Sequence, residues 1–184
     1  MKRLALLLSL AGTCVLGSVF EAGPAFALET PEAQMAASDA ANQAKIDMID
    51  AFGDKLLKPG QFVWRDVPDD AGAERVVISL TDQMAYIYRG ETLMAATTIS
   101  SGRDEKPTPT GIFSVLNKMP MYRSKKYDNA PMPYAEFFEP HGIALHGGVV
   151  GSEPNSHGCV HLPSAFAKKL YSVTQVGTPV YIGA

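Results

Sequence analysis

This sequence has few basic clusters, no long apolar run and few cysteines, and each of these limits the functions that it can have. It has no cluster of basic residues beyond two lysine pairs, Lys125-Lys126 and Lys168-Lys169, and its formal net charge is -3. Such pairs are usually solvated, so nucleic-acid binding is not indicated. Its apolar run over residues 4–16 is too short to span a membrane. It also has only two cysteines among 184 residues, and these two lie in very different surroundings.

The N-terminus has the three parts of a secretory signal peptide. Lys2-Arg3 precede the apolar run, and Ala25-Phe26-Ala27 fits a cleavage site. We therefore predict that residues 1–27 are removed and that the protein is exported to the periplasm. Two alternatives are an uncleaved N-terminal anchor and a lipid attached to Cys14, although the residues before Cys14 match a lipid-attachment site poorly.

Cleavage would leave Cys159 as the single cysteine of the exported chain. Thiols tend to be oxidised outside the cytoplasm, and Cys159 would have no partner within the chain. A leftover thiol in an exported protein indicates either pairing with another molecule or chemistry at the sulfur. An inert buried thiol is the third interpretation, because free cysteines also behave as small hydrophobic residues.

Residues 28–59 are rich in Ala, Asp, Gln and Met. A Thr-Pro pair near the beginning is a typical helix start, and a Pro-Gly pair at the end is a typical stop. Apolar residues recur near helical spacing at Ile46, Ile49 and Phe52. We predict a helical spacer between the signal peptide and the domain, with a disordered tether as the alternative, because isolated helices are marginally stable.

Residues 60–184 have the pattern of a mainly β domain. Runs of β-branched and aromatic residues alternate with Gly and Pro turns, which is typical of packed β-sheets. The segment 120–140 is polar, Pro-rich and aromatic without a clear period, so we predict a long lid or binding loop there. One short helix is expected over 163–171, and strands are expected over 75–88, 92–100, 112–116, 143–145 and 179–182.

All four histidines fall within residues 141–161, together with Cys159. A thiol becomes a useful nucleophile beside a base, and histidine is the natural base near neutral pH. His157 lies two residues before the cysteine, whereas His146 lies at the end of an expected strand and could fold back onto it. The residues alone leave both bases open. They also leave open a zinc site that adds His161, because these ligand types suit zinc although their spacing is unusual.

Gly158 permits a tight turn beside the candidate nucleophile. The successive backbone amides of His157, Gly158 and Cys159 would then point at one spot and stabilise the oxyanion of a tetrahedral intermediate. Removing one such donor costs known enzymes about 3–4 kcal/mol, so the turn would supply a large part of any catalysis.

Four segments match one known pattern. Ser156-His-Gly-Cys-Val160 follows Leu145-His-Gly147, and Pro107-Thr-Pro-Thr-Gly-Ile-Phe113 and Asp82-Gln-Met-Ala-Tyr-Ile-Tyr88 stand upstream. Together they resemble the signature of L,D-transpeptidases with the YkuD-type catalytic domain, over roughly residues 75–182. The Ser-His-Gly-Cys motif is specific when a strand-end His-Gly lies upstream.

The resemblance implies a mainly β fold of packed sheets with a short helix. It also implies a reaction on peptidoglycan stem peptides. A cysteine attacks the diamino-acid carbonyl of a donor tetrapeptide stem and releases D-Ala. An amine of another stem, or of a lipoprotein or outer-membrane protein, then resolves the thioester. Carbapenem-type β-lactams would trap the cysteine, and no cofactor or metal is implied.

By position, the resemblance makes Cys159 the nucleophile and His146 the general acid and base, oriented by the backbone carbonyl of Gly147. The amides of the turn from His157 to Cys159 would form the oxyanion hole. Many members carry Arg or Asn two residues after the cysteine, where this chain has a histidine whose role is open. The residues expected to bind substrate are Ser156, His161, Tyr134 and Phe138.

Two further functions fit the same residues. A hydrolase, such as an L,D-carboxypeptidase, would pass the same thioester to water instead of an amine. A module that binds the cell wall without catalysis would leave the cysteine idle. Covalent addition of a donor peptide to Cys159 separates the idle module from both enzymes, and dependence on an acceptor amine separates the transferase from the hydrolase.

Overall fold

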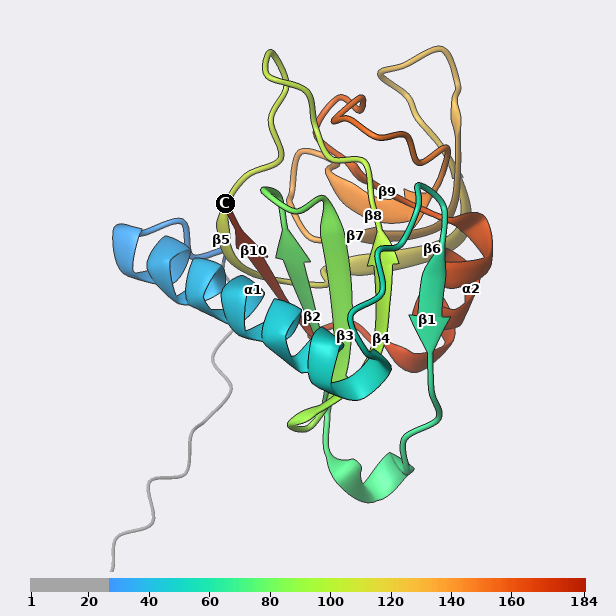
Figure 1. Cartoon of the computed structure of the whole chain (residues 1–184). Helices are drawn as coiled ribbons and strands as arrows, with labels where there is room; N and C mark the ends of the chain where they lie inside the picture. The colour runs from blue at the N-terminus through green and yellow to red at the C-terminus, as the bar shows by residue number, and fades with distance from the viewer. Residues whose placement is uncertain (1–26) are drawn as a thin grey trace, which may run out of the picture.

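The computed structural model describes residues 27–184, which form two β-sheets and two α-helices (Figure 1). The six-stranded sheet has the order β1-β4-β3-β2-β10-β5, and the four-stranded sheet has the order β6-β7-β8-β9. This mainly β architecture confirms the predicted fold class. The predicted signal peptide, together with Cys14 and the two anchor alternatives, lies outside the described residues except for Ala27.

Within the larger sheet, β2, β3 and β4 pair in antiparallel register with their neighbours along the chain, and the other strands join by longer connections. The strands of this sheet are β1 (Phe62–Trp64), β2 (Glu74–Ser79), β3 (Met84–Arg89), β4 (Thr92–Thr98), β5 (Gly111–Ser114) and β10 (Pro179–Gly183). Strand β10 pairs with β2 in parallel and with β5 in antiparallel register. The predicted single strand over 75–88 is in fact two strands. The chain turns between them where Asp82 exchanges hydrogen bonds with Ser79 and Gln83 adopts a φ of 51°.

The smaller sheet contains the main correction to the prediction. Residues 120–140 are not a long loop, because β6 (Asn117–Arg123) and β7 (Pro131–Phe137) pair as a hairpin over most of this segment. Only residues 124–130 form a connecting tip. The two prolines of β7, Pro131 and Pro133, obscured the strand pattern because proline lacks the amide that a strand normally donates. Strands β8 (Ala144–Gly147) and β9 (Val160–Leu162) complete this sheet.

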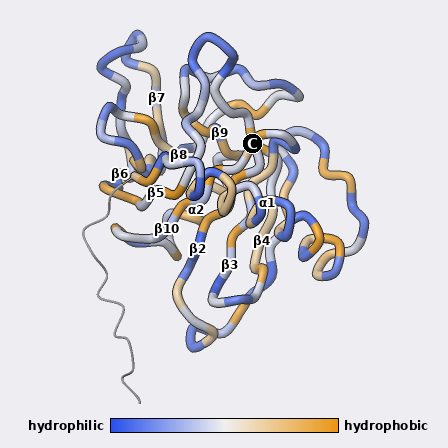
Figure 2. Tube along the Cα trace, turned by 90° about the vertical axis from the view of Figure 1, so that its left-hand side faces the viewer, coloured by the Kyte–Doolittle hydropathy of each residue, from blue (hydrophilic) through white to orange (hydrophobic). Residues whose placement is uncertain are grey.

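The principal hydrophobic core draws residues from both sheets and from helix α2 (Ser164–Val173). Phe166 of α2 is fully buried and meets Phe62 and Trp64 edge to face, each with its ring centroid 5.5 Å away. Figure 2 shows hydrophobic residues concentrated along the strands and hydrophilic residues on several projecting loops. Leu145 of β8 and Val160 and Leu162 of β9 also belong to this core. One face of these two strands is therefore fixed by the core, and the opposite face is available for a site.

Helix α1 (Pro31–Phe52) lies across the outer face of the larger sheet (Figure 1). Its start is as predicted, because the Thr30 hydroxyl accepts a hydrogen bond from the Ala33 amide and Pro31 occupies the first turn. Of the three apolar residues at helical spacing, Ile46 and Ile49 are exposed, whereas Phe52 packs against the sheet. The buried face consists of Ala33, Ala37, Ala41, Ala44 and Met48. A disordered tether does not describe this segment.

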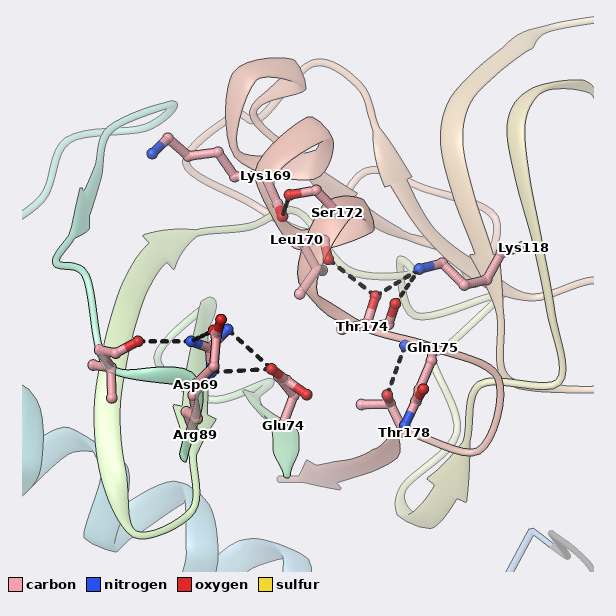
Figure 3. Close-up of polar contacts among 11 residues, drawn as sticks. Asp69, Glu74, Arg89, Lys118, Lys169, Leu170, Ser172, Thr174, Gln175 and Thr178 are labelled. Carbon is pink, nitrogen blue, oxygen red and sulfur yellow. Dashed lines mark hydrogen bonds and ion pairs between the residues drawn. The ribbon is translucent and has the colours of Figure 1, made fainter. Parts of the chain in front are cut away.

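Polar contacts fasten the ends of several elements (Figure 3). Arg89 of β3 donates to Glu74 and Asp69, and Lys118 of β6 donates to the Tyr171 and Thr174 carbonyls at the end of α2. The last carbonyls of a helix have no partner within it, so a lysine placed there satisfies them. The described part of the chain contains no helix long and apolar enough to cross a membrane.

Candidate active site

The pairing of β8 with β9 brings the sequence-predicted site residues together. The two strands are parallel, with His146 opposite His161 and Leu145 opposite Val160. Side chains alternate between the faces of a sheet, so the residue preceding Val160, which is Cys159, shares a face with His161 and with His146 across the ladder. Leu145 and Val160 point to the opposite face, where they enter the core. Burial of these two apolar residues therefore directs the thiol and both imidazoles outward.

This outward face forms the floor of a groove of about 1060 Å³. Cys159 is partly buried and packs against the apolar cluster of Met132, Ala135 and Ala144. The walls come from the β6–β7 hairpin and from the loops on either side of β8. The chemically important residues that line the groove are Cys159, His146, His157, His161, Gly147, Tyr122, Tyr127, Lys125 and Lys126.

His146 is held in one tautomer. It is 5% exposed, and its Nδ1 lies 2.9 Å from the Gly147 carbonyl oxygen. A carbonyl only accepts, so Nδ1 carries the proton and Nε2 keeps a free lone pair. The His161 ring packs edge-on against His146 at a centroid distance of 4.8 Å, and His161 Nδ1 lies 3.3 Å from the Val149 carbonyl. Gly147 thus makes the contact that the resemblance implies, and His161 supports the His146 ring.

No hydrogen bond joins the Cys159 sulfur to the His146 imidazole among the described residues. Cys159 Sγ instead donates a long hydrogen bond, of 4.0 Å, to the Gly142 carbonyl oxygen. Burial raises the pKa of the Cys159 thiol, an effect partly opposed by the Ala144 amide. Burial also lowers the pKa of His146 to about 4, against the raising effect of the Gly147 carbonyl. Both groups are therefore neutral at pH 7.

His157 has a different environment. Its Nε2 lies 3.0 Å from Arg103 Nη2, and its ring stacks on Tyr127 at a centroid distance of 4.4 Å. A guanidinium only donates, so Nε2 of His157 must accept from it. The lone pair that a base would use is already engaged. This contact favours His146 over His157 as the base.

The turn before the cysteine differs from the expected arrangement in one respect. Gly158 adopts a φ of 111°, a region that favours glycine, and its amide donates to Ser156 Oγ at 3.1 Å. The Gly158 amide therefore does not point into an oxyanion hole. Ser156 Oγ in turn donates to the Cys159 carbonyl. Within residues 27–184, the amides of His157 and Cys159 have no hydrogen-bond partner.

Three of the residues expected to bind substrate do not line the groove: Ser156, Tyr134 and Phe138. Ser156 is 2% exposed, and its hydroxyl is engaged within the turn. Phe138 is 1% exposed and packs edge-on against Phe113, and Tyr134 packs towards Tyr171 of α2. Tyr134 of β7 packs against the principal core, and Phe138, which follows β7, is part of that core. Aromatic residues of the groove are instead Phe137, Tyr122 and Tyr127. Treating 120–140 as a loop concealed which of these aromatic residues pack into the core.

The zinc alternative gains no support from the described residues, because no group of three or more His, Cys, Asp or Glu side chains among them is arranged to hold a metal ion. Arg103 is the groove-side residue that the sequence analysis missed. It lies in the loop before β5, 54 residues from His157 in sequence, and no local pattern indicates the contact.

The model of the L,D-transpeptidase catalytic domain family, YkuD, matches residues 73–182, which is more than half of the chain. This chain belongs to that family. The matched segment includes the whole β8–β9 pair, the Ser-His-Gly-Cys turn and the loop that carries Arg103.

Solved L,D-transpeptidases share the fold. One from Mycobacterium smegmatis is 21% identical, with a TM-score of 0.56 over 60% of this chain and 58% of its own. One from Xylanimonas cellulosilytica is 26% identical, with a TM-score of 0.56 over 65% of this chain and 64% of its own. L,D-transpeptidase 3 from Mycobacterium tuberculosis, solved with a faropenem-derived adduct, is 22% identical, with a TM-score of 0.56 over 61% and 60%. The chain thus spans less than two thirds of the length of these family members, and a search of curated proteins gave no match.

Proposed function

We propose that this protein is a peptidoglycan L,D-transpeptidase that uses Cys159 as its nucleophile and His146 as its general acid and base. The observation that carries the proposal is the β8–β9 register, which sets the thiol and the buried imidazole on one face at the floor of a groove. Membership of the L,D-transpeptidase family supplies the reaction class.

The neutral resting pair defines the first half-reaction. Nε2 of His146 takes the thiol proton while sulfur attacks the diamino-acid carbonyl of the donor stem. The unpartnered amide of Cys159 is placed to donate to the oxyanion that forms. The carbon–nitrogen bond to the terminal D-Ala then breaks, and the His146 imidazolium returns the proton to the departing amine. The product is a thioester on Cys159.

The second half-reaction uses an amine in place of D-Ala. The amine attacks the thioester carbonyl, His146 accepts the amine proton, and the proton passes to sulfur as the carbon–sulfur bond breaks. The acceptor is a second stem or an amine-bearing lipoprotein or outer-membrane protein. Val149, which is 81% exposed, lines the same groove as Cys159, and we place the acceptor on this side. We place the reaction in the periplasm, where the predicted signal peptide would deliver the chain.

Intact mass spectrometry tests the proposal. The purified protein is incubated with a tetrapeptide stem, and we expect Cys159 to gain the mass of the donor less D-Ala. The C159A variant should gain nothing, and an acceptor amine should discharge the adduct into a cross-linked product. Discharge by water alone, at a rate that an added amine does not change, would identify a hydrolase. Absence of any adduct on the wild type would contradict the proposal.

A matched pair of histidine variants tests the assignment of the base. H146Q should reduce acylation by about 10²–10⁴-fold, because it removes a positioned general base. H157Q should have a much smaller effect, because Nε2 of His157 is engaged by Arg103. A larger loss in H157Q than in H146Q would reverse the assignment.

A further inference from the structure

The turn Ser156 to Cys159, which we call the nucleophile turn, contacts Thr108. Thr108 lies 51 residues before Cys159 in sequence. It is 4% exposed, and its hydroxyl lies 2.9 Å from both the Gly102 amide and the Gly158 carbonyl. We propose that Thr108 is a positioning residue that aims the Cys159 amide at the oxyanion. The inference rests on the proposed function, since it assumes that Cys159 forms a tetrahedral intermediate.

The direction of each hydrogen bond is determined by its partners. The Gly102 amide can only donate, so the Thr108 oxygen accepts from it. The Gly158 carbonyl can only accept, so the Thr108 hydroxyl proton goes to it. Both hydroxyl interactions are therefore used, and the side chain is fixed on two sides in a buried position.

Fixing the Gly158 carbonyl also fixes the next amide. The peptide bond between Gly158 and Cys159 is planar and trans, so its C=O and N–H point in opposite directions. Because the carbonyl points inward to Thr108, the Cys159 amide points away from Thr108. The Cys159 amide has no partner among the described residues, which is the state required of an oxyanion donor.

The remaining polar groups of the turn are held by Ser156. Its hydroxyl accepts from the Gly158 amide and donates to the Cys159 carbonyl. Ser156 thereby fixes the His157–Gly158 peptide group and the Cys159–Val160 peptide group. Thr108 fixes the Gly158–Cys159 peptide group between them. Of the backbone groups of Gly158 and Cys159, only the Cys159 amide is left free to bind a reacting atom.

The local sequence makes Thr108 a rigid support. It stands between Pro107 and Pro109, whose rings fix φ at their own positions, and the second proline also restricts Thr108 to extended conformations. The neighbouring loop approaches the turn so closely that a Cβ on Gly102 would lie 2.1 Å from the Lys106 carbonyl oxygen and 2.9 Å from Gly158 Cα. The Thr-Pro segment therefore acts on the nucleophile turn as well as starting strand β5.

Two reactions of the same sulfur test the inference. Acylation by a tetrapeptide stem or a carbapenem passes through an oxyanion, whereas alkylation by iodoacetamide displaces iodide and forms none. T108V removes the hydroxyl while keeping the shape, T108A removes it with less bulk, and T108S retains it. T110V is the matched control, because no hydrogen bond of the Thr110 hydroxyl is found among the described residues.

We expect T108V and T108A to acylate about 10- to 100-fold more slowly, since misplacing one oxyanion donor costs at most what removing it does. The loss should fall on the acylation rate constant at saturating donor more than on KM. T108S should acylate within about threefold of the wild type, T110V should match it, and all four should alkylate at the wild-type rate.

Equal losses in acylation and alkylation would show a merely structural role and overturn the inference. Unchanged acylation in a folded T108V or T108A protein would overturn it as well, with the proposed function intact. Failure of the wild type to acylate would instead remove the proposed function and this inference together. Because T108A and T108V differ in bulk, folding of either one, checked by circular dichroism, is sufficient for the test.

Discussion

At the scale of single residues, the site is built around a neutral thiol and a neutral imidazole. The desolvation that raises the pKa of Cys159 and lowers that of His146 acts against an ion pair in both cases, since it penalises each charged form. Cysteine enzymes with a pre-formed thiolate place it in a positive field. Here Arg103 donates to His157, and Lys126 of the groove wall donates to the His141 carbonyl. In the proposed reaction, proton transfer therefore accompanies attack instead of preceding it.

The pH dependence of acylation follows from this arrangement. His146 must be unprotonated to act as the base, and its pKa is lowered to about 4. As pH falls, the acylation rate should hold through pH 6.5, the ordinary value for histidine, and decline only near pH 4. Alkylation by iodoacetamide, which needs the thiolate, should instead keep rising with pH and reach its midpoint above the ordinary thiol value of 9.0.

Stopped-flow acylation by a carbapenem and pseudo-first-order alkylation supply the two profiles, with C159A as the blank. An acylation midpoint near pH 6.5, or half-maximal alkylation below pH 7, would show that a thiolate–imidazolium pair exists before substrate binds.

At the scale of elements, three separate segments close over the groove at one point. The loop before β5 brings Arg103, the β6–β7 tip brings Tyr127, and the loop before β9 brings His157 between them. The tip also carries Lys125 and Lys126 on the groove wall. The stack of Tyr127 on His157 therefore fixes the position of this groove wall.

Loss of the stack should loosen the tip. Y127A removes an aromatic pair worth about 0.5–1.5 kcal/mol, so KM for the donor stem should rise about 2- to 10-fold with a smaller change in kcat. Hydrogen exchange of residues 124–130 should become faster. Y127F keeps the ring, and no hydrogen bond of the Tyr127 hydroxyl is found among the described residues, so it should behave as the wild type. Equal KM values for Y127A and Y127F would show that the stack does not position the wall.

The sequence predicted elements well where local chemistry decides them. Local signals mark the break between the strands over 75–88 and 92–100, the Thr-Pro start of the helix, and the strand that ends at His146. The β6–β7 hairpin had none, because its prolines and its two partly covered faces erase the period of two. Within the site, Cys159 and its histidines could be selected by type and clustering. The contacts of Arg103 and Thr108 are set by loops that meet only in the folded chain.

At the scale of the whole molecule, the larger sheet is covered on both faces. One face meets the smaller sheet and α2, and the other meets α1 through Val77, Tyr86 and their neighbours. Double coverage explains why β2 and β3 carry buried residues at successive positions, Val76 to Ser79 and Met84 to Arg89, instead of at alternate ones. It also explains why α1 buries alanines: small side chains let a helix lie close to a sheet already filled with tyrosines. Ile46 and Ile49 are larger and more apolar than these alanines, yet both lie on the exposed side of the helix.

Replacement of a buried alanine tests whether α1 is part of the folded unit. Ala44 is fully buried against the sheet, so A44L should force the helix outward and lower the free energy of unfolding by about 1–3 kcal/mol. A36L is the matched control, because Ala36 is exposed on the same helix and leucine is nearly as good a helix former as alanine; its effect should stay within about 0.5 kcal/mol. Urea unfolding followed by tryptophan fluorescence measures both, since Trp64 lies in the core and reports on the whole domain. If A44L and A36L unfold at the same urea concentration, α1 does not contribute to the stability of the domain and acts only as the spacer that the sequence suggested.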